Sequence, residues 1–342
     1  MKQLKQIIFT APYVAEYQNV GELDLDKLQE KSVVVKTVVS TISAGTERAN
    51  FVGEKEVSVI STGKDFPREV GYSSAGEVVA VGSAVKKVKV GDRVAIYKGK
   101  HKNYNVMPEE NVVKIEQDRV SYEEAAFSYI ATFPLAAIRK VNLEIGESLL
   151  VMGLGILGQL AVMLAKAAGA YPVIACDPVV ERREEALNNG ADYAFDPFDK
   201  DFVKQVKAVS DGGVKTAIEV TGVGAGLDET LDCMAKLGRV ALLGCTRNSD
   251  FSIDYYHKVH SPGITLVGAH TSARPNYESY PSYFTHEDDI KTVLRLCGGG
   301  RLPIKNLIKE TCLPKNCQET FMRLATDKNF PIGVQFDWKK EV

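Results

Sequence analysis

An apolar run that leads into three spaced glycines constrains the fold of this chain more than any other feature. The run Leu149–Met152 continues as Gly153-Leu-Gly-Ile-Leu-Gly158 and then as an apolar segment of helix length. The first glycine permits a tight turn, the second lets the backbone approach a pyrophosphate, and the third allows close helix–strand packing. Amides at the start of the helix would face the phosphates. We therefore expect a dinucleotide to bind at Gly153, Gly155, Ile156, Leu157 and Gly158.

An acidic residue at the end of the next predicted strand indicates which dinucleotide binds. Asp177 closes Pro172-Val-Ile-Ala-Cys-Asp177 at the spacing expected for a ribose ligand. Its carboxylate would accept hydrogen bonds from the ribose hydroxyls and repel a 2′-phosphate, which favours NAD over NADP. NADP is the alternative, because Arg182 and Arg183 follow in sequence and a guanidinium attracts phosphate. We include Arg182 among the cofactor-binding residues. A glycine-rich turn with an unrelated surface aspartate is the other interpretation.

From Leu149 onward, apolar strand-like runs alternate with segments of helix length. This alternation is typical of a parallel sheet with helices on both faces, the doubly wound α/β fold of Rossmann domains. The predicted strands are 149–152, 173–176, 216–220, 240–243 and 265–267. The predicted helices are 157–168, 180–188, 199–210 and 226–235.

Two turns in this region follow strands where a cofactor would lie across the sheet. Glu219-Val-Thr-Gly222 contains Thr221, and Leu242-Leu-Gly-Cys-Thr246 contains Gly244. Ligands of open α/β sheets bind at the carboxyl ends of the strands, so we expect Thr221 and Gly244 to contact the cofactor. Ordinary strand-to-helix turns are the alternative.

The first 120 residues show a different pattern, in which short β-rich runs are separated by turns. The clearest runs, 32–39, 76–82 and 93–97, predict a barrel or a partly open antiparallel sheet. Ser121 and Glu124 then fit a capping box, which predicts a helix over 123–140. A helix over 289–297 and a strand over 333–337 are predicted near the end of the chain. We expect this tail to return to the first domain.

Composition and charge exclude several classes of function. The 342 residues have a formal net charge of −2 and no block of Lys or Arg, so we expect no nucleic-acid or membrane partner. The first residues lack the apolar core of a signal peptide, which predicts a cytoplasmic protein. Six cysteines without a CxxC pair predict reduced thiols rather than disulfides. The partner that remains is a small-molecule substrate.

Three segments taken together resemble the medium-chain dehydrogenase/reductase superfamily of alcohol and polyol dehydrogenases. They are Gly71-Tyr-Ser-Ser-Ala-Gly-Glu-Val-Val-Ala-Val-Gly82, Val90-Gly-Asp-Arg-Val94 and Gly153-Leu-Gly-Ile-Leu-Gly158. The resemblance runs from Val33 to the last strand and implies a GroES-like catalytic domain over 1–122, a Rossmann domain over 123–288 and a return to the catalytic domain over 289–342. Residues 43–48 resemble a subgroup named after bacteriochlorophyllide dehydrogenases.

The departures from this family concern zinc. Where zinc-dependent members have a cysteine, a histidine and a third cysteine or glutamate ligand, this chain has Ala44, Tyr72 and Tyr129. The first cysteine is Cys176, so the four-cysteine loop that should follow Val94 is missing as well. Catalytic zinc needs three nitrogen, sulfur or carboxylate ligands. The resemblance therefore implies that no metal is bound.

Without a metal, hydrogen-bond donors must stabilise charge on the substrate oxygen. The resemblance aligns Thr46 with a Ser or Thr that relays the hydroxyl proton in zinc-dependent members. It directs Tyr72 and Tyr129 toward the nicotinamide pocket, which makes these three residues the predicted catalytic set. The alternatives are a strand-edge threonine and two tyrosines that only fill the space left by a metal.

Polar residues elsewhere are the candidates for binding substrate. Arg48, His101 in the loop 99–104 and Arg274 are the predicted substrate-binding residues. Arg274 belongs to the segment 270–286, which is rich in hydrogen-bonding groups and begins at His270, after a predicted Rossmann strand. We expect His270 to approach the nicotinamide. A solvated histidine and a polar surface segment or dimer contact are the alternatives.

These observations predict a zinc-independent, NAD-linked dehydrogenase that transfers hydride to or from a secondary alcohol, sugar-like or cyclic. An enone or quinone reductase that uses NADPH is the first alternative, and Asp177 argues against it. A catalytically silent dinucleotide-binding sensor is the second. The family resemblance implies a homodimer or homotetramer joined through sheet edges near 264–270.

Overall fold

The structure, a computed structural model, describes residues 2–54, 66–246 and 249–339 and contains two compact units. Unit 1 comprises Met1–Ile130, Ile290–Gly299 and Ile304–Val342, and unit 2 comprises Ala131–Asp289 and Gly300–Pro303. The helices α3 (Ser128–Lys140) and α8 (His286–Gly298) contribute residues to both units. Within these described ranges, no helix is long and apolar enough to cross a membrane.

Unit 2 is built on a six-stranded sheet with the order β11-β10-β9-β12-β13-β14. Every pair of neighbouring strands is parallel, and the chain starts in the middle of the sheet and winds outward in both directions. This is the doubly wound arrangement that the sequence predicted. The strands are β9 (Leu149–Met152), β10 (Val173–Cys176), β11 (Tyr193–Phe195), β12 (Val214–Glu219), β13 (Met234–Leu242) and β14 (Thr265–Gly268).

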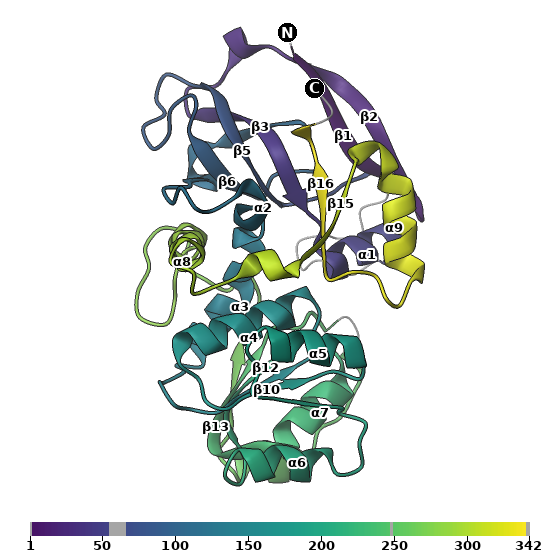
Figure 1. Cartoon of the computed structure of the whole chain (residues 1–342), viewed down its shortest axis with the longest axis vertical. Coiled ribbons are helices and arrows are strands. Elements are labelled where there is room, and N and C mark those ends of the chain that lie inside the picture. Colours follow the sequence, from purple (N-terminus) through teal and green to yellow (C-terminus); the bar gives the residue numbers. More distant parts are fainter. Residues whose placement is uncertain (1, 55–65, 247–248, 340–342) are drawn as a thin grey trace. The chain divides into compact units, whose positions relative to one another are not determined.

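Helices cover both faces of this sheet, with α4 and α5 on one side and α6 and α7 on the other (Figure 1). Because successive strand residues point to opposite faces, Leu150 and Met152 pack in one cluster with Phe202 and Val206 of α6. Burial of both faces explains why the strands are continuous apolar runs rather than alternating ones. The helices are α4 (Ile156–Ala168), α5 (Val180–Asn188), α6 (Phe202–Val209) and α7 (Gly224–Asp232).

Unit 1 contains a seven-stranded sheet in which β3 is central. Its order is β15-β16-β3-β5-β6-β8, and β7 also pairs with β3. All pairs except β15–β16 are antiparallel, in agreement with the predicted antiparallel sheet. The strands are β3 (Ser32–Thr41), β5 (Ser73–Val81), β6 (Arg93–Tyr97), β7 (Tyr104–Pro108), β8 (Val112–Lys114), β15 (Ile308–Cys312) and β16 (Gly333–Asp337).

A hairpin of β1 (Lys2–Ala11) and β2 (Val14–Leu23), extended by β4 (Arg68–Glu69), forms a second sheet of unit 1. Two helices, α1 (Ala44–Val52) and α9 (Cys317–Thr326), share its core. The rings of Phe9, Phe51 and Phe321 meet there at centroid distances of 4.7–5.7 Å. The C-terminal helix α9 and strand β16 thus pack within unit 1.

Several details of the prediction differ from the structure. The helix predicted over 123–140 is two helices, α2 (Tyr122–Ala125) and α3, although the capping box of Ser121 and Glu124 is present. At the break, Ser128 Oγ donates a hydrogen bond to Ala125 O, and Phe127 N donates to Glu124 O, three residues earlier, instead of to an oxygen four residues earlier. The helix predicted over 226–235 ends at Asp232, because β13 begins at Met234. The β1–β2 hairpin and the edge strand β11 were not predicted.

Candidate functional site

The glycine-rich turn of unit 2 joins β9 to α4. Gly153 has a φ of +97°, and a Cβ on Gly158 would lie 1.9 Å from Gly153 O, so neither position accepts a side chain. Helix α4 begins at Ile156, and Gln159 N donates to Gly155 O at 2.9 Å. The amides of Ile156 and Leu157, which precede Gln159, therefore have no acceptor within the helix. This is the geometry of an anion-binding helix N-terminus.

Asp177 lies at the carboxyl end of β10 beside this turn. Its Oδ2 accepts a hydrogen bond from Leu154 N at 2.8 Å, and its Oδ1 accepts one from Val179 N at 2.9 Å. The carboxylate is 4% exposed, and Arg182 Nη1 lies 3.6 Å from Oδ2. Arg183 instead donates to the backbone oxygens of Asp177 and Pro178. The structure therefore brings the glycine turn, Asp177 and Arg182 together.

A second group of predicted cofactor residues lies at the ends of β12 and β13. Thr221 donates to the carboxylate of Glu219 through its amide and its hydroxyl, and Gly244 N donates to Glu219 O at 2.8 Å. A Cβ on Gly244 would lie 2.3 Å from Gly222 N, so the two turns touch. Burial raises the pKa of Glu219, although its hydrogen bonds from Thr221 and Gly222 act in the opposite direction. The sequence assigned Glu219 no role, yet it holds both turns together.

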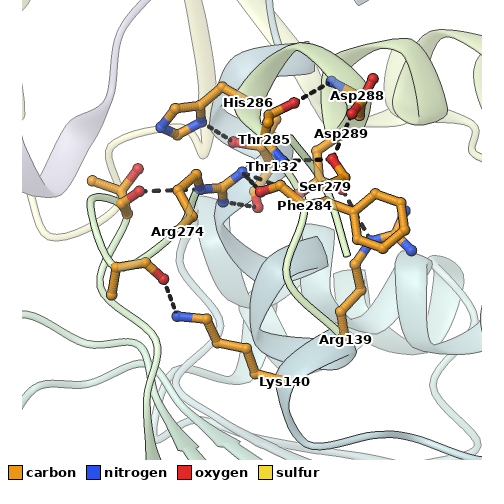
Figure 2. A network of polar contacts seen from close by, with 12 residues as sticks. Thr132, Arg139, Lys140, Arg274, Ser279, Phe284, Thr285, His286, Asp288 and Asp289 are labelled. Carbon is orange, nitrogen blue, oxygen red and sulfur yellow. Dashed lines mark hydrogen bonds and ion pairs between the residues drawn. The ribbon is translucent and has the colours of Figure 1, made fainter. Parts of the chain in front are cut away.

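Arg274, predicted to bind substrate, lies in a buried polar network of unit 2 (Figure 2). Its side chain is 3% exposed; Nη1 lies 3.0 Å from Asp289 Oδ2, and Nη2 donates to Thr132 O at 2.9 Å. Arg139 Nε donates to the other oxygen of Asp289 at 3.0 Å. The prediction that Arg274 binds substrate is therefore wrong, because its donors hold the segment 271–285 against α3. His270, at the start of this segment, is partly exposed and its Nδ1 lies 2.7 Å from Ser272 Oγ.

In unit 1, the three predicted catalytic residues lie together with Ser43. The Tyr72 hydroxyl donates a short hydrogen bond to Ser43 Oγ. The rings of Tyr72 and Tyr129 meet edge to face at a centroid distance of 5.6 Å. Thr46 lies in the first turn of α1, and its side chain is close enough to lower the pKa of Tyr72, against the larger effect of burial. Tyr97, which the sequence did not single out, packs on Tyr129 at 5.4 Å.

The environment keeps Tyr72 protonated. Burial raises the pKa of Tyr72 well above its usual value, and the Glu47 carboxylate and Tyr129 act in the same direction. Hydrogen bonds with Ser43 and Thr46 oppose this shift without cancelling it. A tyrosine in this state donates a hydrogen bond but does not act as a base at neutral pH.

The other two predicted substrate residues of unit 1 differ in their surroundings. Arg48 lies on the exposed side of α1 and forms a 3.9 Å ion pair with Glu54. His101 is fully buried, with Nε2 2.8 Å from Glu47 Oε2 and Nδ1 2.7 Å from Ser40 Oγ. The prediction that His101 contacts substrate is therefore wrong, because both ring nitrogens bond protein groups within the core. No sequence pattern indicated Glu47 or Ser40 as its partners.

The residues that the sequence resemblance assigns to the family's zinc positions offer few donor atoms. Ala44 has no donor atom, and the hydroxyls of Tyr72 and Tyr129 replace nitrogen and sulfur ligands. Across residues 2–54, 66–246 and 249–339, no group of three or more His, Cys, Asp or Glu side chains has an arrangement that could hold a metal ion. None of these three side chains thus offers the nitrogen, sulfur or carboxylate donor that zinc prefers.

Comparison with known families extends over both units. Residues 29–117 match the family described as alcohol dehydrogenase GroES-like domain, and residues 157–285 match the one described as zinc-binding dehydrogenase. These matches confirm the predicted combination of a GroES-like N-terminal region with a Rossmann sheet.

Individual relatives are similar over most of the chain. L-threonine 3-dehydrogenase of Pyrococcus abyssi is 30% identical over 315 residues, which cover 84% of this chain and 86% of the relative. D-guloside 3-dehydrogenase of Escherichia coli is 26% identical over 274 residues, covering 78% and 77%. The structure of galactitol-1-phosphate dehydrogenase from Escherichia coli has a TM-score of 0.84 and 18% identity, covering 97% of this chain and 99% of that one, and supports the fold.

Proposed function

Since the chain belongs to the medium-chain alcohol dehydrogenase superfamily, we propose that it transfers hydride between NAD(H) and a secondary alcohol or ketone without zinc. The observation that carries the proposal is the cluster of hydroxyls of Ser43, Thr46 and Tyr72, in which Tyr72 donates to Ser43 Oγ and Thr46 lies close to both. By the family resemblance, this cluster occupies the region where zinc-dependent members bind their metal. Hydroxyl donors thus replace the Lewis acid there.

The chemistry assigns each group a role. In oxidation, the substrate carbon loses a hydride to the nicotinamide, and the substrate hydroxyl loses its proton. Zinc would stabilise the intermediate charge on oxygen. Here Thr46 donates a hydrogen bond to it instead, together with Tyr72, whose one hydroxyl proton turns from Ser43 Oγ to the substrate oxygen. Thr46 relays the proton to solvent water, since a hydroxyl accepts one proton as it donates its own. In reduction, the same groups deliver a proton to the carbonyl oxygen.

The cofactor-binding groups all belong to unit 2. The amides of Ile156 and Leu157 face the pyrophosphate, and Asp177 binds the ribose hydroxyls, as its buried position beside the glycine turn supports. A carboxylate oxygen has more than one lone pair, so Asp177 can bind ribose while it accepts the amide of Leu154. Its negative charge disfavours the 2′-phosphate of NADP. Thr221, Gly244 and His270 complete the proposed cofactor site.

The substrate is a small polyhydroxylated or cyclic secondary alcohol. The names of two relatives, D-guloside 3-dehydrogenase and L-threonine 3-dehydrogenase, denote oxidation at carbon 3, and the first denotes a sugar derivative. Arg48, which is exposed on α1 beside Thr46 in sequence, remains the proposed substrate-binding cation. The edge strand β14, which includes the 38% exposed Leu266, is the proposed contact of a homodimer or homotetramer.

One set of assays tests the proposal against its alternatives. The zinc content of the purified, untagged protein is measured as isolated. The protein is then assayed before and after dialysis against a chelator, with NAD and a panel of polyols and sugar derivatives, and with NADPH and quinones or enones. We expect NAD-dependent turnover of a polyol and well under one zinc per chain by elemental analysis. Stoichiometric zinc with chelator-sensitive activity would contradict the metal-free mechanism. Turnover only of quinones with NADPH would support a reductase, and binding without turnover would support a sensor.

A further inference from the structure

The buried His101 belongs to a linear array of hydrogen bonds inside unit 1. Trp338 Nε1 donates to Ser40 Oγ at 2.8 Å, Ser40 Oγ lies 2.7 Å from His101 Nδ1, and His101 Nε2 lies 2.8 Å from Glu47 Oε2. Ser40 Oγ accepts from Trp338 and can donate its own proton to Nδ1. A tautomer with its proton on Nε2 fits this arrangement, because that nitrogen then donates to the carboxylate of Glu47. Each member of the array is satisfied in this direction.

Glu47 connects this array to the start of α1. Its second oxygen, Oε1, accepts a hydrogen bond from Ser43 N at 2.9 Å, and its own amide donates to Ser43 O at 2.9 Å. Ser43 has no side-chain cap of its own for the helix, so Glu47 closes this first turn. The turn contains both Ser43, which accepts from the Tyr72 hydroxyl, and Thr46. The orientation of Glu47 therefore determines where these two hydroxyls lie.

His101 also contacts the chain immediately before Tyr72. Its amide donates to Val70 O at 2.9 Å, and its ring lies against Gly71. Gly71 has a φ of +88°, and a Cβ there would lie 2.5 Å from His101 N and 2.7 Å from its Cγ. Only glycine allows this close approach. The same residue thus contacts the turn that presents Tyr72 and, through Glu47, the turn that presents Thr46.

The surroundings make this arrangement rigid. The side chains of His101 and Glu47 are 0% and 2% exposed. The imidazole packs edge to face on Phe336 of β16 at 5.2 Å. A buried polar network whose members are all paired specifies one geometry, because any other would leave a donor or acceptor unpaired in a low dielectric.

We propose that His101 is a positioning residue of the catalytic cluster, which holds Thr46 through Glu47 and Tyr72 through Gly71 in the arrangement that proton transfer needs. The inference rests on the proposed function, in which Thr46 and Tyr72 are the proton-transferring groups. His101 acts through these neighbours and does not touch substrate. A small displacement of reacting groups can lower turnover about 100-fold.

Four variants with one matched control test this inference in the full-length enzyme. They are His101→Ala, His101→Gln, Tyr72→Phe and the double variant His101→Gln/Tyr72→Phe. Met107→Ala, in a separate core cluster of unit 1, lowers stability without touching the array and is the control. Turnover, NADH affinity and thermal stability are measured for each.

We expect His101→Ala to lower kcat about 10- to 100-fold. His101→Gln should lower kcat less, because the amide side chain restores one hydrogen bond. NADH affinity should stay within about twofold, since unit 2 is unaltered. The turnover of the double variant should be no lower than that of the more impaired single variant, because both substitutions disrupt the same group of hydrogen-bonded residues.

Two results would overturn the inference and leave the proposed function standing. In the first, Tyr72→Phe lowers turnover, but the His101 variants lose no more turnover than Met107→Ala does when the proteins are equally destabilised. In the second, the losses in the double variant multiply, so that His101 acts independently of Tyr72. If Tyr72→Phe and Thr46→Val are themselves without effect, the proposed proton route fails, and the positioning role fails with it.

Discussion

The hydroxyl of Tyr72 donates a hydrogen bond to Oγ of Ser43, 29 residues away in sequence, at the start of α1. This contact joins the turn before β5 to the helix that presents Thr46. It assembles three hydroxyl groups where the family resemblance places a metal site. The predictions below test this cluster, the cofactor site and the buried network of unit 2.

Removing the hydroxyl of Tyr72 tests the proton route. Loss of a well-aimed oxyanion donor typically lowers turnover about 10²–10³-fold, so Tyr72→Phe or Thr46→Val should lower kcat at least about tenfold. NAD affinity should stay nearly constant. Tyr104→Phe, which removes a hydroxyl from a buried tyrosine of β7, is the control. Near-full turnover in Thr46→Val, Tyr72→Phe and Tyr129→Phe alike would refute the route.

Removing the carboxylate of Asp177 tests cofactor choice. Hydrogen bonds to a charged group contribute about 1.5–3 kcal/mol, so Asp177→Ala should weaken NADH binding about 10- to 100-fold. NADPH binding should weaken less. The ratio of the NADPH and NADH dissociation constants, measured by fluorescence titration, should therefore decrease or reverse. Asp196→Ala, which removes a carboxylate 3.5 Å from Arg183, should leave the ratio unchanged. Tighter NADPH than NADH binding by the unaltered enzyme would show that Arg182 outweighs Asp177.

The raised pKa of Tyr72 predicts a stability difference at alkaline pH. A raised pKa in the folded state means that the unfolded chain loses this proton first, near its usual value of about 10. The stabilising contribution is therefore complete below about pH 10 and declines above it. Relative to Tyr72→Phe, the wild-type free energy of unfolding should fall as the pH rises through this window. A constant difference between the two proteins across it would contradict the pKa shift.

Asp289 accepts from both Arg139 and Arg274 at 0% exposure, so its charge should be important for stability. Asp289→Asn keeps the size but removes the buried negative charge that two guanidinium groups share, which should cost about 3–5 kcal/mol. Urea unfolding measures this loss. The matched variant Asp201→Asn removes a carboxylate from an exposed pair with Lys204 and should cost under about 1 kcal/mol. Equal losses in the two variants would show that the buried Asp289 carboxylate contributes no more to stability than an exposed one.

Much of unit 2 was predictable from the sequence alone, because its decisive features are local. The positive φ at Gly153 and the contact of Gly158 with Gly153 O involve residues close in sequence. The position of Asp177 follows from one strand–turn–helix–strand unit of fixed length. Continuous apolar runs then predict a parallel sheet buried on both faces. That Ala44, Tyr72 and Tyr129 stand where the family resemblance places zinc ligands was equally visible in the sequence.

The partners of buried charges, in contrast, were decided by the tertiary structure. His101 meets Glu47 across 54 positions, and Arg274 meets Thr132 across 142. No local pattern encodes such pairs, since burial comes from the packing of distant strands and helices. The sequence therefore suggested that His101 and Arg274 are available for substrate, whereas in the fold both are buried and hydrogen-bonded to other parts of the chain. The desolvation of a charge requires a partner, and only the folded chain determines which one is within reach.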